Sequence, residues 1–415
     1  MKIENIILLT LPIFALLVLL SISDISELEF FDEQESIALS QTKQNLIRDD
    51  STKFTSNNDE LEAEFDNYDK IYQEEHAAFK NKIENQWGEF KDSSETQWIS
   101  YVDQGNVRRL VDFETGDVSV DLLFEAGKSV SRKNKRQLEK ELFSLLNTTE
   151  FDAFQADEVS QRVEARLPSN FRMIQRGSPS DRRLFSINDL TSVHFNYSGI
   201  VKVSGKTKHT VHSDVLKAKV SNKKILRFAL SVEQSSLEKA SRYADTVSLA
   251  SQKQKIPTAL IYAIMESESS FNPLAKSHVP AYGLMQIVPR SAGKDATKHL
   301  YGKAKILAPS YLYSTDNNIN VGSAYLHVLY YKYMHKVTDP QSRIYCAIAA
   351  YNTGASNVAR AFIKKKNFNK AVKQINKLTP DQVYQKLIKS LPFRETRRYV
   401  KKVAANMKKY QVDQG

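Results

Sequence analysis

The sequence predicts an α+β domain followed by a mainly α-helical domain within a chain of 415 residues. A β-hairpin is expected first, because residues 118–124 alternate between apolar and polar side chains after a Glu-Thr-Gly-Asp turn. Strand-like stretches return between residues 200 and 230. Beyond residue 231 apolar residues recur at helical spacing. We therefore expect an α+β N-terminal domain over residues 60–230 and a helical domain over residues 231–415.

An apolar segment precedes these domains. Residues 6–22 are apolar except for Thr10, Pro12 and Ser21, which is longer than a usual signal-peptide core and close to the minimum for a membrane-spanning helix. We expect residues 1–23 to be an uncleaved signal anchor, or else a signal peptide cut after Ser21-Ile22-Ser23. Either interpretation predicts that the body of the protein is exported and, in the first, that residues 6–22 attach it to a membrane.

Charge is divided unevenly along the chain. Residues 1–100 hold 21 Asp and Glu against 8 Lys and Arg, whereas the remainder holds 27 against 51. Residues 24–59 are acidic and polar, so we interpret them as a tether between membrane and domains. The basic remainder suggests a polyanionic partner. No nucleic-acid-binding motif is present, and an exported protein meets the cell wall, so we expect no nucleic-acid partner.

The expected α+β domain opens with a helix whose apolar stripe runs from Leu61 to Ile83 and leads to Trp87. The hairpin at residues 108–124 follows, and Leu138, Leu142 and Leu145 mark another helix. The aromatic residues could form a sugar-stacking platform, but at these spacings they are more often core.

The stretch Ile256–Pro289 carries the most specific pattern in the chain. On a helix from Pro257 to Asn272, apolar residues (Leu260, Ile261, Ile264 and Met265) share one face, with Glu268 on that face and Glu266 nearly opposite. A carboxyl group on a buried stripe is ion-paired, neutral or functional, and desolvation raises its pKa toward the range of a general acid. A helix end at which Glu268 meets solvent fits the periodicity equally well.

This stretch and later blocks resemble one enzyme family. The matching residues are Glu268-Ser269-Ser270-Phe271-Asn272-Pro273, Ser277, Gly283-Leu284-Met285-Gln286, Pro289, Asn318-Ile319, Gly322, Tyr325-Leu326, Ala350-Tyr351-Asn352, Gly354, Glu395-Thr396 and Tyr399-Val400. In this order they resemble the lytic transglycosylases with a goose-lysozyme-like catalytic domain, which cut bacterial peptidoglycan. The membrane-bound type C branch is most similar, although its usual N-terminal lipid-anchoring cysteine is absent. The resemblance implies a lysozyme-like fold for residues 231–415 and peptidoglycan glycan strands as the partner.

The resemblance also implies a mechanism with a single glutamate. Most glycosidases need two carboxyl groups, but the nearest later acids, Asp295 and Asp316, fall in no matching block. Glu268 would protonate the bond between MurNAc and GlcNAc and then, as a base, help the MurNAc C6 hydroxyl close a 1,6-anhydro ring without water.

The implied substrate-binding residues have structural alternatives. Ser277 would orient Glu268 or the acetamido group, Gln286 and the backbone at Met285 would contact the sugar, and Asn352 would hydrogen-bond it. Tyr325 and Tyr351 would line the subsites beside the cut bond, and Glu395 and Tyr399 would close one end of the groove. Tyr325 and Tyr351 could instead be core residues, the charged run around Glu395 could be plain surface, and Gly283-Leu284 a structural turn.

The remaining features are expected to be structural. A single helix is predicted over residues 237–251, and the Lys-rich segment Lys401–Lys409 is interpreted as solvated surface. Cys346, the only cysteine, is expected in the core. The eight histidines show no ligand spacing such as His-x3-His, so no metal or cofactor is implied.

Two other functions remain open at this point. A hydrolase of the same fold would use water in place of the C6 hydroxyl. A non-catalytic wall-binding scaffold would keep the fold for glycan recognition, although loss of Glu268 or Gln286 would be expected in it, and both are present.

Overall fold

The computed structural model describes residues 57–168, 174–184, 192–195, 201–204, 209–219, 222–232, 234–277 and 280–412. These residues form two compact units, one within residues 333–402 and a larger one within residues 57–332 together with 403–412. The predictions for residues 1–56, the 6–22 segment and most of the tether included, lie outside the described residues. No helix among the described residues combines the length and apolar character needed to cross a bilayer.

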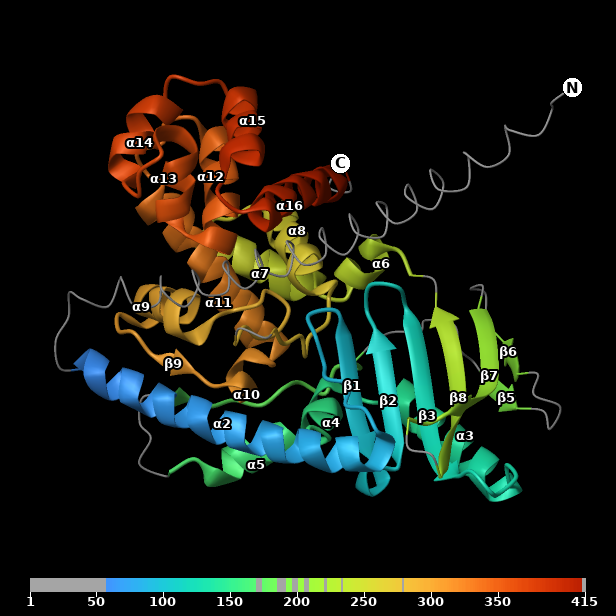
Figure 1. The fold of residues 1–415 in the computed structure, drawn as a ribbon. Coiled ribbons are helices and arrows are strands. Elements are labelled where there is room, and N and C mark those ends of the chain that lie inside the picture. The colour runs from blue at the N-terminus through green and yellow to red at the C-terminus, as the bar shows by residue number, and fades with distance from the viewer. Residues whose placement is uncertain are drawn as a thin grey trace, which may run out of the picture. The chain divides into compact units, whose positions relative to one another are not determined.

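The larger unit contains an antiparallel five-stranded sheet in the order β1-β2-β3-β8-β7 (Figure 1). Its strands are β1 (Gln97–Val102), β2 (Val107–Asp112), β3 (Asp117–Glu125), β7 (His209–Lys217) and β8 (Lys223–Val232). The predicted hairpin is confirmed as β2 and β3. Its turn is closed by Asp112, whose Oδ1 accepts from the Thr115 N–H at 2.9 Å, and by Gly116, whose φ of 82° favours glycine.

Two short strand pairs lie outside this sheet. β5 (Ser192–Phe195) pairs with β6 (Val201–Ser204), and β4 (Ile174–Gln175) pairs in parallel with β9 (Ile306–Leu307). The second pair joins the region before residue 230 to the helical region after it.

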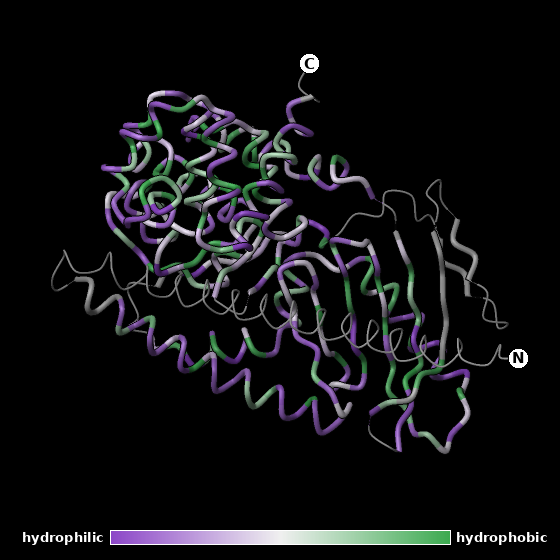
Figure 2. Tube along the Cα trace, turned by 45° about the horizontal axis from the view of Figure 1, so that its top comes forward, coloured by the Kyte–Doolittle hydropathy of each residue, from purple (hydrophilic) through white to green (hydrophobic). Residues whose placement is uncertain are grey.

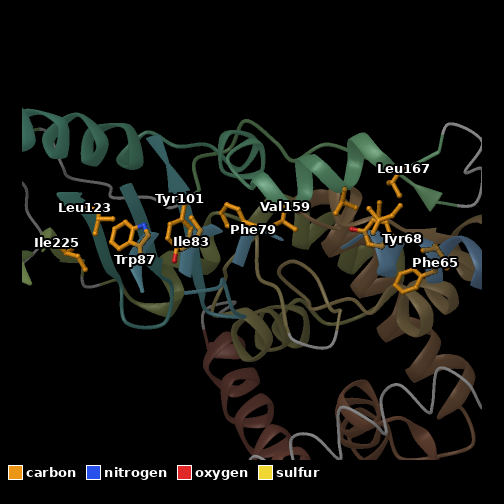
Figure 3. Packing of buried hydrophobic residues seen from close by; sticks show 14 residues of the cluster. Phe65, Tyr68, Phe79, Ile83, Trp87, Tyr101, Leu123, Val159, Leu167 and Ile225 are labelled. Carbon is orange, nitrogen blue, oxygen red and sulfur yellow. The ribbon is translucent and has the colours of Figure 1, made fainter. Parts of the chain in front are cut away.

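Helices α2 (Asn57–Trp87), α3 (Arg132–Leu146), α4 (Glu150–Gln155) and α5 (Glu158–Arg166) accompany the sheet. Figure 2 shows short hydrophobic stretches recurring along the otherwise hydrophilic α2. These side chains enter a core that continues from Phe65 and Tyr68 through Phe79 and Ile83 to Trp87 (Figure 3). Since both tryptophans are also buried, the preference for core over a sugar-stacking platform is confirmed.

Helices follow directly after β8. They are α6 (Ser236–Ser241), α7 (Ala244–Gln254), α8 (Thr258–Ser269), α9 (Lys294–Tyr301), α10 (Pro309–Leu312) and α11 (Thr315–His327), with π-helical turns at Pro289–Gly293 and Val328–Tyr333. The predicted single helix over 237–251 is wrong, because it breaks between α6 and α7. Tyr243 at the break is buried and stacks on Phe271 at a centroid distance of 6.0 Å, so tertiary packing overrides the local helical pattern.

The smaller unit is helical. It comprises α12 (Pro340–Thr353), α13 (Ala355–Ile363), α14 (Phe368–Ile375), α15 (Pro380–Ser390) and the first part of α16 (Arg394–Val412). Cys346 is fully buried on α12, where burial raises the pKa of its thiol to about 12, so its predicted core position is confirmed. The predicted fold class, α+β followed by mainly α-helical, is also confirmed. The domain limits at 60–230 and 231–415 stay predictions.

The Lys-rich segment Lys401–Lys409 is not simply solvated surface, and that interpretation is wrong for one of its faces. Val403, Met407 and Tyr410 follow the i, i+4, i+7 spacing and are buried in the larger unit. Lys409 itself forms an ion pair with Glu266 at 2.6 Å. The segment is therefore part of an amphipathic helix, and its apolar stripe is buried.

Candidate active site

Glu268 lies in the last turn of α8. The helix follows Pro257, and its predicted apolar face (Leu260, Ile261, Ile264 and Met265) is fully buried. The helix ends at Ser270 and Phe271, whose φ values of 51° and 68° are left-handed. Glu268 has intermediate burial. Glu268 therefore lies at the end of the helix and is neither fully buried nor fully exposed.

Glu266 occupies a different environment on the same helix. Its carboxylate accepts hydrogen bonds from Ser236 Oγ at 2.7 Å, Lys409 Nζ at 2.6 Å and Tyr410 Oη at 2.8 Å. Burial by itself would raise the pKa of Glu266, but these hydrogen bonds outweigh it and hold the pKa below its usual value. Glu266 is thus a structural anchor that stays ionised, which leaves Glu268 as the candidate acid on α8.

A tight turn at Gly283–Gln286 is fastened to α8 and α11. Ser269 Oγ donates to the Leu284 carbonyl at 2.8 Å. Asn318 on α11 accepts from the Met285 N–H at 2.8 Å. The same side chain donates to the carbonyls of Tyr282 and Leu312, at 2.8 and 2.7 Å. Asn318 is fully buried, and its three hydrogen bonds hold the backbone of this turn in place.

Gly283 is required where the turn meets α11. Its φ is 74°, and a Cβ at this position would collide with the Asn318 side chain. The structural interpretation of Gly283 therefore has direct support.

Gln286 carries an unsatisfied polar atom. Its Nε2 donates to the Gly283 carbonyl at 3.0 Å, while its Oε1 is buried and has no hydrogen-bond partner within the described part of the chain. The residue is 8% exposed and has a left-handed φ of 45°. A buried acceptor without a donor is uncommon in folded proteins and needs an explanation.

Met285 and Tyr325 lie close to Gly322 of α11. The Met285 side chain is fully buried, and a Cβ on Gly322 would collide with its sulfur atom. Gly322 therefore makes room for Met285. Tyr325, one turn along the helix, has intermediate burial, so it is not a fully buried core tyrosine.

Ser277 lies in the segment between α8 and this turn. Its N–H donates to the Ala281 carbonyl at 3.2 Å, and the residue lines a cavity facing α2. Part of the cavity wall thus comes from the N-terminal end of the described chain.

Four predicted site residues belong to the smaller unit, and a hydrogen bond joins the two helices that carry them. Tyr351 and Asn352 occupy the last turn of α12, and Glu395 and Tyr399 the first turns of α16. Thr396 Oγ1 donates to Asn352 Oδ1 at 2.8 Å, and both residues are buried. Tyr399 is 9% exposed, whereas Tyr351 and Glu395 have intermediate burial. The charged run around Glu395 is therefore not plain surface.

Sequence reasoning missed residues that position the site. Asn318 stood in a matching block, but its three hydrogen bonds were not foreseen. Glu150 is fully buried on α4, and Thr315 Oγ1, at the start of α11, lies 2.9 Å from both of its carboxylate oxygens. Burial raises the pKa of Glu150. No sequence pattern singled out this link across 165 positions. Among the described residues no group of three His, Cys, Asp or Glu could hold a metal ion.

Comparison with known proteins assigns the helical region to a class. Residues 245–374 match the family model described as the transglycosylase SLT domain, so this part of the chain is an SLT domain.

Similar proteins include the membrane-bound lytic murein transglycosylases C of Sodalis glossinidius and Cronobacter sakazakii, which are 45% and 44% identical over 173 residues. The matches cover 42% of this chain and 48% and 47% of those proteins, so the chain spans about half the length of the curated relatives it matches. The 70 kDa soluble lytic transglycosylase of Escherichia coli is similar at 29% identity, with a TM-score of 0.32 over 42% of this chain and 24% of that one.

Proposed function

We propose that the protein is a peptidoglycan lytic transglycosylase that cleaves the β-1,4 bond between MurNAc and GlcNAc and leaves 1,6-anhydroMurNAc ends. The proposal is supported by the SLT domain and by the names of its relatives. The observation that carries it is the partly buried Glu268, at a helix end fastened to the turn that holds the buried, unpartnered Oε1 of Gln286.

In the proposed mechanism Glu268 acts twice. Protonated Glu268 donates to the glycosidic oxygen, and the substrate's acetamido carbonyl stabilises the cationic centre. The carboxylate of Glu268 then removes the proton of the MurNAc C6 hydroxyl, which attacks the anomeric carbon. Intramolecular attack has an effective molarity on the order of 10⁵ M or more when well oriented, so the ring closure outcompetes water. No second carboxyl group is needed.

The other predicted residues bind the glycan. Gln286 Oε1 accepts from a sugar hydroxyl or amide N–H, and the backbone at Met285 contacts the sugar while its side chain stays in the core. Ser277 orients Glu268 or the acetamido group, and Tyr325 lines a subsite beside the cut bond. In the smaller unit, Tyr351 lines a subsite, Asn352 hydrogen-bonds the glycan, and Glu395 and Tyr399 close one end of the groove.

We also propose that the protein works on the exported side of a membrane, attached through residues 6–22. The relatives are named as membrane-bound enzymes, and the apolar run supplies the simplest attachment in this chain.

Digestion of purified peptidoglycan by the full chain tests the chemistry. Mass spectrometry should show products lighter by one water than hydrolytic ones. Glu268→Gln should abolish product release yet keep binding to sacculi, because the amide preserves shape but cannot supply a proton. Glu266→Gln is the matched control, on the same helix but anchored to α16, and should retain turnover.

The alternatives make different predictions for the same digest. Products with added water would identify a lysozyme-type hydrolase. Sacculus binding without any product, from wild type and Glu268→Gln alike, would identify a wall-binding scaffold and refute the enzymatic proposal.

A further inference from the structure

A cavity of mixed charge adjoins the candidate site within the larger unit. One wall is a single face of α2, where Asp69, Tyr72, Gln73 and His76 follow the i, i+3, i+4, i+7 spacing. The others come from the segment Asp92–Glu95 and from residues just before the Gly283–Gln286 turn, among them Lys276 and Ser277. Elements about 200 positions apart in the chain thus enclose one space next to a predicted substrate-binding residue.

Lys276 brings a cation to this wall, and among the described residues its ion-pair partner is at the outer limit of ion-pair distance. Its Nζ donates to Tyr72 Oη and lies 4.6 Å from the centre of the Tyr72 ring. The carboxylate oxygen paired with it, Asp92 Oδ2, is 3.9 Å away and lies 2.7 Å from His76 Nε2. Burial lowers the pKa of Lys276 to about 8. A desolvated ammonium whose carboxylate is distant and shared gains from a further anion.

Acidic side chains line the same cavity. Asp69 lies on the α2 wall, where burial raises the pKa of its carboxyl group despite the nearby charge of Arg290. Glu95 lines the cavity from the neighbouring segment. A carboxyl group with a raised pKa gains from an added cation. The cavity therefore suits a ligand that carries a carboxylate and an ammonium group together.

We propose that this cavity binds the peptide stem of peptidoglycan, with Lys276 pairing with a stem carboxylate and Asp69 with a stem ammonium group. The inference rests on the proposed function. The glycan itself offers few charges, whereas the stem carries free carboxylates and, on its diamino acid, an amino group. The stem also branches from the MurNAc residue whose bond is cut, so it leaves the glycan close to the residues that hold that sugar. Ser277 directly follows Lys276 and would mark the junction between sugar and peptide.

The test compares two substrates with the full-length protein. One is a set of peptide-bearing glycan strands, and the other is the same strands stripped of stems by an amidase. The wild type should cleave peptide-bearing strands with the higher kcat/KM. Lys276→Gln should reduce the ratio of the two kcat/KM values about tenfold, because it removes one charge-assisted hydrogen bond to the stem. Lys70→Gln, an exposed lysine of α2, is the matched control and should leave the ratio unchanged.

A second variant and a direct binding measurement distinguish loss of the stem site from misfolding of the Lys276→Gln variant. Asp69→Asn should lower the same ratio from the α2 side. The free stem peptide released by the amidase should bind wild type in calorimetry and bind Lys276→Gln about tenfold more weakly. An equal loss of kcat/KM on both substrates, or no change on either, would contradict the proposed stem site. A wild type inactive on both substrates would instead refute the proposed function, and peptide binding would still report on the cavity.

Discussion

At the scale of single residues, two glutamates on α8 lie in different surroundings and have different expected roles. Glu266 is ionised and bound by three donors, so its role is to fasten α8 to the end of α16. Glu268, two positions later, reaches the helix end beside the turn that presents Gln286. Helical geometry sends neighbouring side chains in different directions, which is why two similar glutamates can have unrelated roles.

Lys276 gives a pH-dependent prediction at the same scale. Below pH 8 the residue is protonated in both the folded and unfolded states, and its buried charge costs stability. Between its folded pKa of about 8 and the ordinary value of 10.5, the unfolded state binds more protons, so the free energy of unfolding rises with pH. The gain from pH 8 to 9.5 should be about 1.5 kcal/mol.

Urea denaturation of wild type and Lys276→Met at several pH values measures this effect. Subtracting the two curves removes the titration of other groups, and the difference should contain the predicted rise. Parallel curves would show that Lys276 has an ordinary pKa in the folded protein.

At the scale of elements, α8, the Gly283–Gln286 turn and α11 form one hydrogen-bonded assembly around Asn318. Asn318→Ala would leave the Met285 N–H and two backbone carbonyls without their partner. Since each unsatisfied buried group costs about 1–3 kcal/mol, we expect a loss of about 2–4 kcal/mol in unfolding free energy after partial relaxation. Turnover should fall as well, because the turn positions Gln286.

Asn317→Ala is the control for this prediction, because Asn317 is adjacent but less buried. It should change the unfolding free energy by less than about 0.5 kcal/mol. Equal effects of the two substitutions in chemical denaturation would rule out a special role for Asn318.

These elements also show what the sequence could predict. α8 and the β2–β3 hairpin were predictable because a buried face leaves a periodic signal in the chain. The break before α7 was not, because it depends on Tyr243 packing against Phe271, 28 positions away. The site residues came from family resemblance, whereas the contact of Lys276 with Tyr72 spans 204 positions and leaves no local pattern.

At the scale of the molecule, the larger unit combines the sheet region with residues 245–332, the first part of the SLT match. Glu150 reaches the start of α11, and Arg290 forms ion pairs with Glu62 and Asp66 of α2. Asn272, fully buried after α8, donates to the Glu95 carbonyl at 3.3 Å. The α+β region therefore supports the segments that carry the candidate site.

Residues 231–415 expressed alone should consequently be less stable than the full chain. The fragment loses the Glu150–Thr315 and Lys276–Tyr72 contacts and exposes the surfaces that they bury. With about 1–3 kcal/mol for each lost buried hydrogen bond, and about 2–4 °C per kcal/mol for a fragment of roughly 150–250 residues, its Tm should fall by at least about 5 °C. Circular dichroism of both proteins measures this change. An unchanged Tm would mean that the SLT region folds independently, and the α+β region would then have to contribute to the proposed function through binding alone.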